Sequence, residues 1–377
     1  MKKFHCDSIA QKLYFVSPTF VYYGNDSSAL VRYYCIYMTR VAINGFGRIG
    51  RAFFRAAWND SEIDVVGIND LGNIDNFSYL LKYDSVYGTF APTVSTESGG
   101  LSVGDKRIHF TSEKDPTKLP WRELAVDVVV EATGVFESYE KAGAHLAAGA
   151  KRVVITAPVK EDQGGETVLV GVNEEKLKTC TISSNASCTT NAGSPLIAIL
   201  DEKLGIEKAL LNTVHAYTAT QALVDGPVRG SDMRRGRAAA HNIVPSSTGA
   251  AVAVTKAYEN LSGKFDGISL RVPVVAGSIV DITFIAKRET TAEEVNKILE
   301  QAAGEARWKG IFTTTQEPIV SSDIIGNPHA SIADLAMTRV VGGTLVKVLG
   351  WYDNEMGYAH TLLQHVKAAG KYSKARP

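Results

Sequence analysis

The stretch Val41-Ala42-Ile43-Asn44-Gly45-Phe46-Gly47-Arg48-Ile49-Gly50 decides the fold of the first part of the chain. It joins a short apolar run to a GxGxxG turn, and a helical pattern and a second apolar run follow over 51–68. Strand, glycine turn, helix and strand in this order predict a βαβ unit. Gly45 permits the tight turn, Gly47 lets a pyrophosphate approach the backbone, and Gly50 lets the helix pack closely on the strand. The free N–H groups of the helix then face the phosphates of a dinucleotide.

An acidic residue at the end of the second apolar run indicates which dinucleotide. Asp70 follows the turn by about 20 residues, the spacing at which a carboxylate accepts hydrogen bonds from ribose hydroxyls. Its negative charge would repel a 2′-phosphate, so NAD is favoured over NADP. The alternative interpretation is a plain turn residue in Asn69-Asp70-Leu71-Gly72.

Further alternation of strands and helices follows. Residues 127–131 and 152–156 are near-continuous in Val and Ile, as buried parallel strands are, and a helical pattern over 139–148 lies between them. Residues 84–118 predict a short antiparallel excursion. Thr133-Gly134 should fall at the carboxyl edge of the sheet, where ligands bind in this architecture.

The pattern changes after residue 188. Longer alternating runs predict strands over 209–218, 267–274, 278–287, 330–340 and 344–351, with a hairpin at Gly342-Gly343. Helical patterns cover 192–204, 249–261, 291–303 and 357–369, and we expect the last to pack back on the first domain. The fold class is therefore an α/β Rossmann-type dinucleotide-binding domain plus an α+β domain with a mostly antiparallel sheet. We place the first at 38–187 with 355–377, and the second, which carries the candidate catalytic residues, at 188–354.

Residues 1–37 differ from the rest of the chain. They are rich in Tyr and Phe and show neither helical nor strand periodicity. Lys2-Lys3 before an apolar stretch would suit a targeting peptide, but Pro18 interrupts that stretch and no small-residue cleavage site follows. We expect Met38 to be the physiological start and 1–37 to be a disordered extension or translated upstream sequence. The intact mass of the native protein would decide.

Charge and cysteine content exclude several classes of protein. Lys+Arg and Asp+Glu number 40 each, so no net field favours nucleic acid or a membrane surface as partner. The four cysteines lie far apart without CxxC spacing, which indicates reduced thiols in a cytoplasmic protein and neither a disulfide frame nor a metal site. No run of about 18 apolar residues predicts a membrane-spanning helix.

The octapeptide Ser184-Asn185-Ala186-Ser187-Cys188-Thr189-Thr190-Asn191 lies between a strand-like run and a helical pattern. Cys188 is therefore expected near a helix N-terminus, whose partial positive charge favours the nucleophilic thiolate. Its small and hydroxylated neighbours supply the donors that an oxyanion or phosphate needs. A buried core thiol is the alternative, but such a thiol usually has apolar neighbours.

A base and anion-binding groups follow in the second domain. His215 lies near the end of a predicted strand, before Thr218 and Gln221, and an imidazolium there would lower the pKa of the thiol and take up a proton. Arg271 stands between apolar residues and needs a buried anionic partner, either a ligand phosphate or a carboxylate. Ser247-Thr248-Gly249 opens a helix, where it either caps the helix or binds phosphate.

Three motifs in combination resemble those of the phosphorylating glyceraldehyde-3-phosphate dehydrogenases, namely 43–50, 184–191 and Trp351-Tyr352-Asp353-Asn354-Glu355. The resemblance runs from about Thr39 almost to the C-terminus. It implies oxidation of D-glyceraldehyde 3-phosphate to 1,3-bisphosphoglycerate, with NAD and inorganic phosphate, through a thioester on Cys188 with His215 as base. It also implies a homotetramer, because the long irregular segment 217–244 matches one that reaches a neighbouring subunit's cofactor.

The resemblance also assigns the other site residues and implies no metal. Cofactor contacts are implied for Asn44, Gly45, Gly47, Arg48, Ile49, Gly50, Asp70, Lys114, Thr133, Asn354 and Tyr358, with Asn354 orienting the nicotinamide carboxamide. Thr218 and Arg271 match the site of the substrate's C3 phosphate. Ser187, Thr189, Thr248 and Gly249 match the site of the attacking phosphate. Arg235 completes these phosphate sites, with Arg234 one residue away as the alternative. Ala192 stands where many members carry a second cysteine.

Two other functions remain as alternatives. Erythrose-4-phosphate dehydrogenase shares the octapeptide and the glycine motif, but Thr218 and Thr248-Gly249 fit the triose-phosphate pattern better. A non-catalytic dinucleotide-binding protein is a different class, and the presence of both Cys188 and His215 argues against it.

Overall fold

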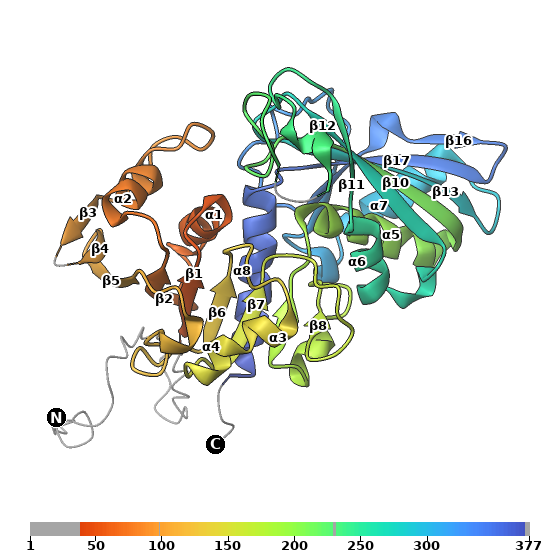
Figure 1. Cartoon of the computed structure of the whole chain (residues 1–377). Helices are drawn as coiled ribbons and strands as arrows, with labels where there is room; N and C mark the ends of the chain where they lie inside the picture. The colour runs from red at the N-terminus through yellow and green to blue at the C-terminus, as the bar shows by residue number, and fades with distance from the viewer. Residues whose placement is uncertain (1–37, 98, 229–230, 374–377) are drawn as a thin grey trace, which may run out of the picture.

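The computed structural model describes residues 38–97, 99–228 and 231–373 and contains two β-sheets side by side, with helices packed around them (Figure 1). The predictions for residues 1–37 lie outside this range. Among the described residues, no helix combines the length and the apolar character needed to cross a membrane.

The first sheet has nine strands in the order β3-β4-β5-β2-β1-β6-β7-β9-β8. All pairs from β5 to β8 are parallel, whereas β3-β4 and β4-β5 are antiparallel, so the predicted excursion is confirmed. The strands are β1 (Thr39–Asn44), β2 (Ile63–Asn69), β3 (Val94–Glu97), β4 (Gly100–Val103), β5 (Lys106–Thr111), β6 (Val128–Glu131), β7 (Arg152–Ile155), β8 (Glu166–Thr167) and β9 (Ile182–Ser184).

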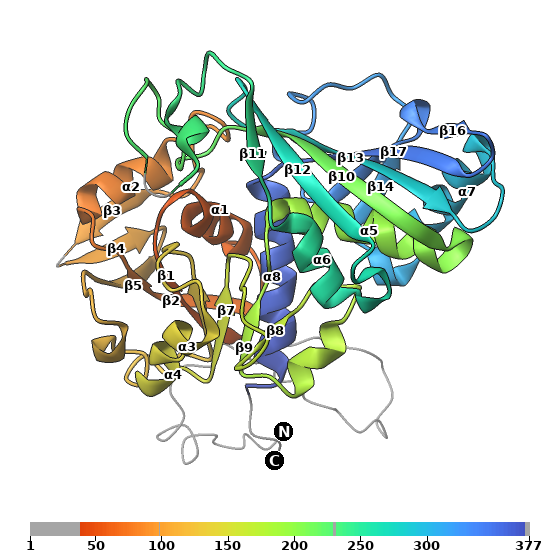
Figure 2. The ribbon, with the colours of Figure 1, turned by 45° about the vertical axis from the view of Figure 1, so that its right-hand side comes forward.

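Both faces of this sheet are covered, which is why its central strands lack a polar face. Val128 and Val130 pack into one hydrophobic cluster with α1 (Arg48–Ala57) and α8 (Met356–Lys371). Val129, between them, packs into another cluster on the opposite face, with α3 (Tyr139–Ala142) and its neighbour α4 (Ala144–Ala147) (Figure 2). The two-residue period of the strand thus supplies two cores at once.

Two helical predictions in this region need correction. The single helix expected over 139–148 is two short helices, because the chain breaks its helical hydrogen bonding at Gly143. The helix α2 (Ile74–Lys82) was not predicted. Its apolar stripe is short, with Ile74 and Phe77 half-buried and Leu81 fully buried, and Asn73 caps its N-terminus through the N–H groups of Asp75 and Asn76.

The second sheet has the order β11-β12-β10-β13-β17-β15-β14, with β16 paired to β17. It is mostly antiparallel as predicted, with two parallel pairs, β10-β12 and β14-β15. Its strands are β10 (Ile206–Ala216), β11 (Val244–Ser247), β12 (Phe265–Val272), β13 (Ser278–Ala286), β14 (Phe312–Thr315), β15 (Ser331–Asp334), β16 (Arg339–Val341) and β17 (Leu345–Tyr352).

The strand predicted over 330–340 was wrong as a single element. A short 3-10 turn over Leu335–Met337 divides it into β15 and β16, which pair with different parts of β17. The hairpin at Gly342-Gly343 is confirmed: both glycines have positive φ, 58° and 73°, and join β16 to β17.

The helix α5 (Cys188–Leu204) links the two sheets and is buried on nearly every side, between the second sheet and the helices α6 (Ala250–Ala257), α7 (Ala292–Ala303) and α8. The predicted helix began at 192, four residues too late. Because Cys188 is its first residue, the structure places the thiol at the helix end, as the sequence indicated. The C-terminal α8 packs on α1, which confirms that the last helix returns to the first sheet.

Candidate active site

Two adjoining cavities of about 390 Å³ each open at the carboxyl edge of the first sheet. One is lined by Gly45, Gly47, Asp70 and Lys114, and the other by Cys188, His215 and the residues around them. They share Ala132, Thr133 and Phe136, so together they form one groove from the glycine turn to the thiol. The predicted cofactor residues and the predicted nucleophile thus meet in one place.

The glycine turn has the shape that a dinucleotide requires. Gly45 has φ 95°, and a Cβ on Gly50 would lie 2.1 Å from the carbonyl oxygen of Gly45, so both positions need glycine. A Cβ on Gly47 would meet no atom within 4 Å, so the space beside this glycine is open to a ligand. Gly47 starts α1 without a side-chain cap, which leaves helix N–H groups for phosphate oxygens.

The residues beside the turn hold it in place. The carboxylate of Asp70 accepts hydrogen bonds from the N–H groups of Phe46 (2.6 Å) and Gly72 (3.0 Å). The backbone N–H and the hydroxyl of Thr133 donate to Glu131, at 2.8 and 2.5 Å. The amide of Asn44 is buried and donates to Glu131 as well, at 2.6 Å. Asn44 therefore fixes the strand end and has its amide N–H engaged inside the protein.

The thiol sits at a sharp turn between β9 and α5. Ala186 has φ 52°, an unusual left-handed conformation for a residue with a side chain, and its carbonyl accepts a hydrogen bond from the hydroxyl of Tyr358 (3.0 Å). Ser187 caps α5 through its hydroxyl and the N–H of Thr190 (3.1 Å). The Sγ atom of Cys188 lies 3.3 Å from Nε2 of His215, at the end of β10. The candidate nucleophile and the candidate base are therefore within contact distance.

The electrostatics of this pair differ from the expected thiolate and imidazolium. Burial lowers the pKa of His215 to about 3, and the positive charge of Arg271 acts in the same direction. Burial raises the pKa of the Cys188 thiol, although Arg271 and hydrogen bonds from Thr189 oppose the change. Desolvation therefore outweighs the helix end, and both pKa shifts favour the neutral thiol and the neutral imidazole over the ion pair.

The candidate anion-binding residues fall into two groups. Nη1 of Arg271 lies 2.8 Å from Nδ1 of His215, which itself donates to the carbonyl of Ala216 (2.6 Å). The guanidinium donates to the same carbonyl (3.2 Å), and it is paired with no carboxylate by any contact the structure describes. Arg235 donates to the hydroxyls of Thr220 (3.3 Å) and Ser246 (3.0 Å). Thr218 lies just past the end of β10 and lines the groove with Thr220. Arg271 thus reaches the groove through His215, and Arg235 reaches it through Thr220.

Three further phosphate candidates, Thr189, Thr248 and Gly249, are also not among the residues that line the groove. The hydroxyl of Thr189 is buried and contacts the hydroxyl of Tyr352 (2.9 Å). Thr248 accepts from the N–H of Ala250 (3.2 Å), and Gly249 is the N-cap of α6, so the capping interpretation fits both. The start of α6 nevertheless lies next to that of α5, because the hydroxyl of Thr190 donates to the carbonyl of Ala250 (3.4 Å).

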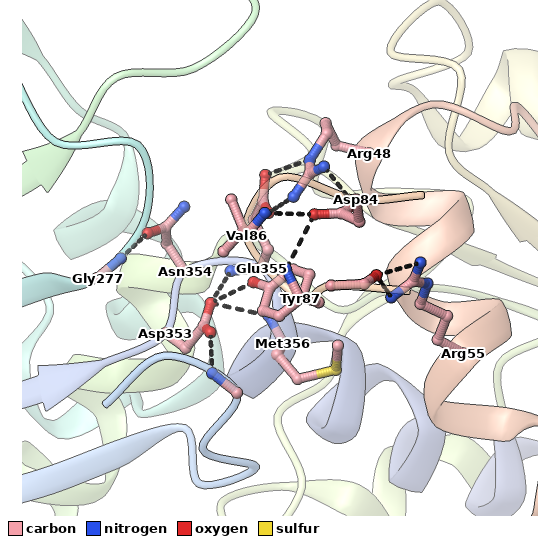
Figure 3. Close-up of polar contacts among 12 residues, drawn as sticks. Arg48, Arg55, Asp84, Val86, Tyr87, Gly277, Asp353, Asn354, Glu355 and Met356 are labelled. Atoms are coloured by element: carbon pink, nitrogen blue, oxygen red, sulfur yellow. Dashed lines mark hydrogen bonds and ion pairs between the residues drawn. The ribbon is translucent and has the colours of Figure 1, made fainter. Parts of the chain in front are cut away.

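Asn354 lies at the thiol end of the groove with its orientation fixed. Its Oδ1 accepts hydrogen bonds from the N–H of Gly277 (3.1 Å) and the hydroxyl of Ser278 (3.0 Å), as Figure 3 shows for Gly277. Only the amide oxygen can accept from an N–H, so the NH₂ group is the end left to donate to a ligand. Ile49 and Tyr358 complete the wall around it.

Some residues of the site were missed from the sequence. Asp84, Tyr87 and Glu355 surround Arg48 and the turn that carries Asn354 (Figure 3). Glu355 belongs to the Trp351–Glu355 motif and could have been singled out there. Asp84 and Tyr87 carried no signal, because their partners are far away in the sequence: Tyr87 and Asp353 are 266 positions apart.

Comparisons with known proteins agree with this geometry. Residues 39–139 match the model "Glyceraldehyde 3-phosphate dehydrogenase, NAD binding domain", and residues 187–354 match "Glyceraldehyde 3-phosphate dehydrogenase, C-terminal domain". A relative from Thermotoga maritima, named glyceraldehyde-3-phosphate dehydrogenase, is 50% identical over 329 residues, which are 86% of this chain and 97% of the relative. The enzyme named glyceraldehyde-3-phosphate dehydrogenase 2 of Streptomyces avermitilis is 46% identical over 327 residues, 86% of this chain and 96% of the relative. NAD is thus the cofactor, and the chain belongs to the glyceraldehyde-3-phosphate dehydrogenase family.

Proposed function

We propose that this chain oxidises D-glyceraldehyde 3-phosphate with NAD and inorganic phosphate, giving 1,3-bisphosphoglycerate through a thioester on Cys188. The observation that carries the proposal is the 3.3 Å contact between Sγ of Cys188 and Nε2 of His215, at one end of a groove whose other end is the glycine turn. The names of the relatives support the choice of substrate.

The neutral pair suits the first step. As Sγ attacks the aldehyde carbon, the thiol proton passes to Nε2 of His215 and then to the new oxyanion, which gives a hemithioacetal. In the second step His215 takes the hydroxyl proton as the hydride leaves the carbon, and NAD held in the groove would supply the hydride acceptor. The product on Cys188 is a thioester. The proton of the neutral imidazole lies on Nδ1, which donates to the carbonyl of Ala216 (2.6 Å), and Nε2 is therefore the nitrogen that can accept a proton at each stage.

The anion groups give the substrate its orientation. Arg271 and Thr218 would hold the C3 phosphate, and its two negative charges would draw the guanidinium away from Nδ1 of His215. Ser187, Thr189, Thr248 and Gly249 lie around the two neighbouring helix starts, where free N–H groups would hold the attacking phosphate. That phosphate attacks the thioester carbon, and the sulfur of Cys188 leaves.

One assay tests substrate, cofactor and phosphorolysis together. NADH formation from glyceraldehyde 3-phosphate is measured with and without inorganic phosphate. We expect sustained turnover with phosphate, and without it only a burst limited by the amount of enzyme. Sustained NADH formation without phosphate would contradict phosphorolysis. A larger kcat/KM for erythrose 4-phosphate than for glyceraldehyde 3-phosphate would identify the alternative enzyme.

We also propose a homotetramer in the cytoplasm. Support for assembly comes from the segment 217–244, whose apolar side chains Leu223, Val224, Met233 and Ile243 are exposed in the single chain. Support for a reducing compartment comes from the free thiols Cys180 and Cys188. Light scattering after size-exclusion chromatography should give the mass of four chains, and cell fractionation should recover the activity with cytoplasmic markers.

The division into domains is a proposal as well. We assign 38–187 with 355–377 to the NAD-binding domain and 188–354 to the catalytic domain. The two separate sheets and the packing of α8 on α1 support this division. Hydrogen exchange of the two sheets in urea, with and without NAD, would test it, since NAD should protect the first set of strands more strongly.

A further inference from the structure

A network of hydrogen bonds and ion pairs surrounds the turn between β17 and α8, which carries Asn354 (Figure 3). Part of it comes from the short segment 83–90 between α2 and β3, which no step of the mechanism uses. Asp84 and Tyr87 are the members of this segment that reach across to the turn.

Arg48, at the start of α1, joins two carboxylates. Its Nε and Nη2 atoms donate to the two oxygens of Glu355, with the first contact at 2.9 Å, and its Nη1 donates to Asp84 at 2.6 Å. Burial alone would lower the pKa of Arg48, but these two carboxylates raise it above its usual value. The side chain of Asp84 is only 6% exposed and that of Arg48 is 34% exposed, so the carboxylate half of this ion pair is shielded from solvent.

Asp84 and Tyr87 act as one rigid piece. The second oxygen of Asp84 accepts the N–H groups of Val86 (2.8 Å) and Tyr87 (3.1 Å), which closes the turn. On its other side the segment is held by Arg55, whose guanidinium donates to the carbonyls of Leu81 (2.6 Å) and Gly88 (3.1 Å). Arg55, which belongs to α1, therefore fixes the backbone on both sides of Tyr87 and with it the position of the tyrosine ring.

Tyr87 then fixes Asp353, the residue before Asn354. Its hydroxyl donates to Oδ1 of Asp353 at 2.8 Å, and Asp353 is fully buried. The same carboxylate accepts the N–H groups of Glu355 (2.9 Å) and Met356 (3.0 Å) and, through Oδ2, that of Gly326 (2.7 Å). Burial raises the pKa of Tyr87, so the phenol keeps the proton that it donates.

We propose that Tyr87 and Asp84 are positioning residues for Asn354, and through it for the nicotinamide ring. Asn354 lies between Asp353, which is bound by Tyr87, and Glu355, which is bound by Arg48. Its free NH₂ group can face the carboxamide of NAD only while this turn keeps its conformation. Neither Tyr87 nor Asp84 lines the groove, so they act through Asn354 and touch no reacting atom.

Binding measurements with two ligands test this inference. ADP-ribose has the adenine, riboses and pyrophosphate of NAD but lacks nicotinamide. In Tyr87→Phe we expect the Kd of NAD to rise about three- to tenfold, the effect of one hydrogen bond to a carboxylate that is only partly transmitted. The Kd of ADP-ribose should change less than about twofold. Calorimetry on the full chain gives both values without turnover.

A matched control and a second variant make the outcome clear. Tyr83→Phe removes a hydroxyl from the same segment, on a ring that is 44% exposed, and should alter neither affinity. Asp353→Asn removes the carboxylate that accepts the hydroxyl of Tyr87 and leaves the pair of Arg48 and Asp84 in place, so it should repeat the selective loss, should Tyr87→Phe fail to fold. Equal weakening of both ligands, or no weakening of NAD, would overturn the positioning role.

The inference rests on the proposed function only for its kinetic consequence. If the wild-type chain turns over glyceraldehyde 3-phosphate, Tyr87→Phe should lower kcat and raise KM for NAD while KM for the aldehyde stays within about twofold. If the wild type forms no NADH, the proposed function fails, but the ratio of the NAD and ADP-ribose affinities still decides whether Tyr87 positions the nicotinamide end of the groove.

Discussion

A thiol whose pKa is raised by burial is a good nucleophile only when a base beside it takes the proton. Cys188 has such a base in His215, and the raised and lowered pKa values of the two groups both favour the neutral pair. Cys188 and His215 then place no net or separated charge in the buried site before the substrate binds. Under the proposed mechanism, charge develops only when sulfur attacks, at the N-terminal end of α5, where the partial positive charge of the helix favours an oxyanion.

Replacement of the thiol should remove turnover and spare cofactor binding. In Cys188→Ser the neutral imidazole faces a hydroxyl, which gives up its proton far less readily than a thiol, so we expect phosphate-dependent NADH formation to fall about 10³-fold or more. The Kd of NAD should stay within about twofold. Cys180→Ser is the control, because Cys180 is buried in the hydrophobic cluster that the first sheet forms with α1 and α8, and it lines neither cavity. Near-normal turnover of Cys188→Ser would exclude a covalent mechanism.

Two adjacent arginines offer a second test at this scale. Arg235 is half-buried and contacts Thr220, which lines the groove, whereas Arg234 is exposed. In Arg235→Leu we expect KM for the phosphorylated aldehyde or for inorganic phosphate to rise about tenfold, the effect of one charge-assisted hydrogen bond. Arg234→Leu should change both KM values less than about twofold. A larger effect in Arg234→Leu would show that the assignment is shifted by one residue.

Among the helices and strands, those whose formation depends on neighbours in the sequence were predicted correctly. The βαβ unit follows from an apolar run, three glycines and a helical pattern, and all of these lie within about 30 residues. Two other features depend on residues far along the chain, and no local sequence pattern predicts them. They are the parallel pairing of β10 with β12 and the division of β15 from β16. The same holds for the site: Cys188, His215 and Asp70 stand in recognisable motifs, whereas Tyr87 matters only because of Asp353.

The glycine turn gives a prediction about one element. Gly50→Ala would press a Cβ to 2.1 Å from the carbonyl oxygen of Gly45, so α1 must shift on β1 and we expect a loss of about 1–3 kcal/mol in the free energy of unfolding. Gly47→Ala meets no protein atom within 4 Å, so stability should change by less than about 1 kcal/mol while the Kd of NAD rises about tenfold or more. Urea unfolding and calorimetry measure the two effects. Equal destabilisation by both variants would contradict separate roles for the two glycines.

On the scale of the whole molecule, α8 ties the cofactor sheet to the turn before the nucleophile. His365 on α8 is fully buried and contacts the hydroxyl of Ser183 (2.8 Å) and Oδ1 of Asn185 (3.0 Å), both close to Cys188 in the chain. Burial lowers the pKa of His365 to about 3, as it does for His215. Because burial favours the neutral imidazole at both His215 and His365, the free energy of unfolding should depend on pH.

The sign of this dependence follows from proton counting. An unfolded histidine has a pKa of about 6.5, so between about pH 6.5 and pH 3 the unfolded chain binds a proton at each position that the folded chain does not. The free energy of unfolding therefore falls as the pH drops through this window, and each histidine should remove about 2 kcal/mol between about pH 7 and pH 5. In His365→Gln, whose amide can meet the same two partners, the urea midpoint should fall less steeply over this range. His241→Gln, at an exposed position, should keep the wild-type slope. A wild-type slope in His365→Gln would show that this histidine is not held neutral by the fold.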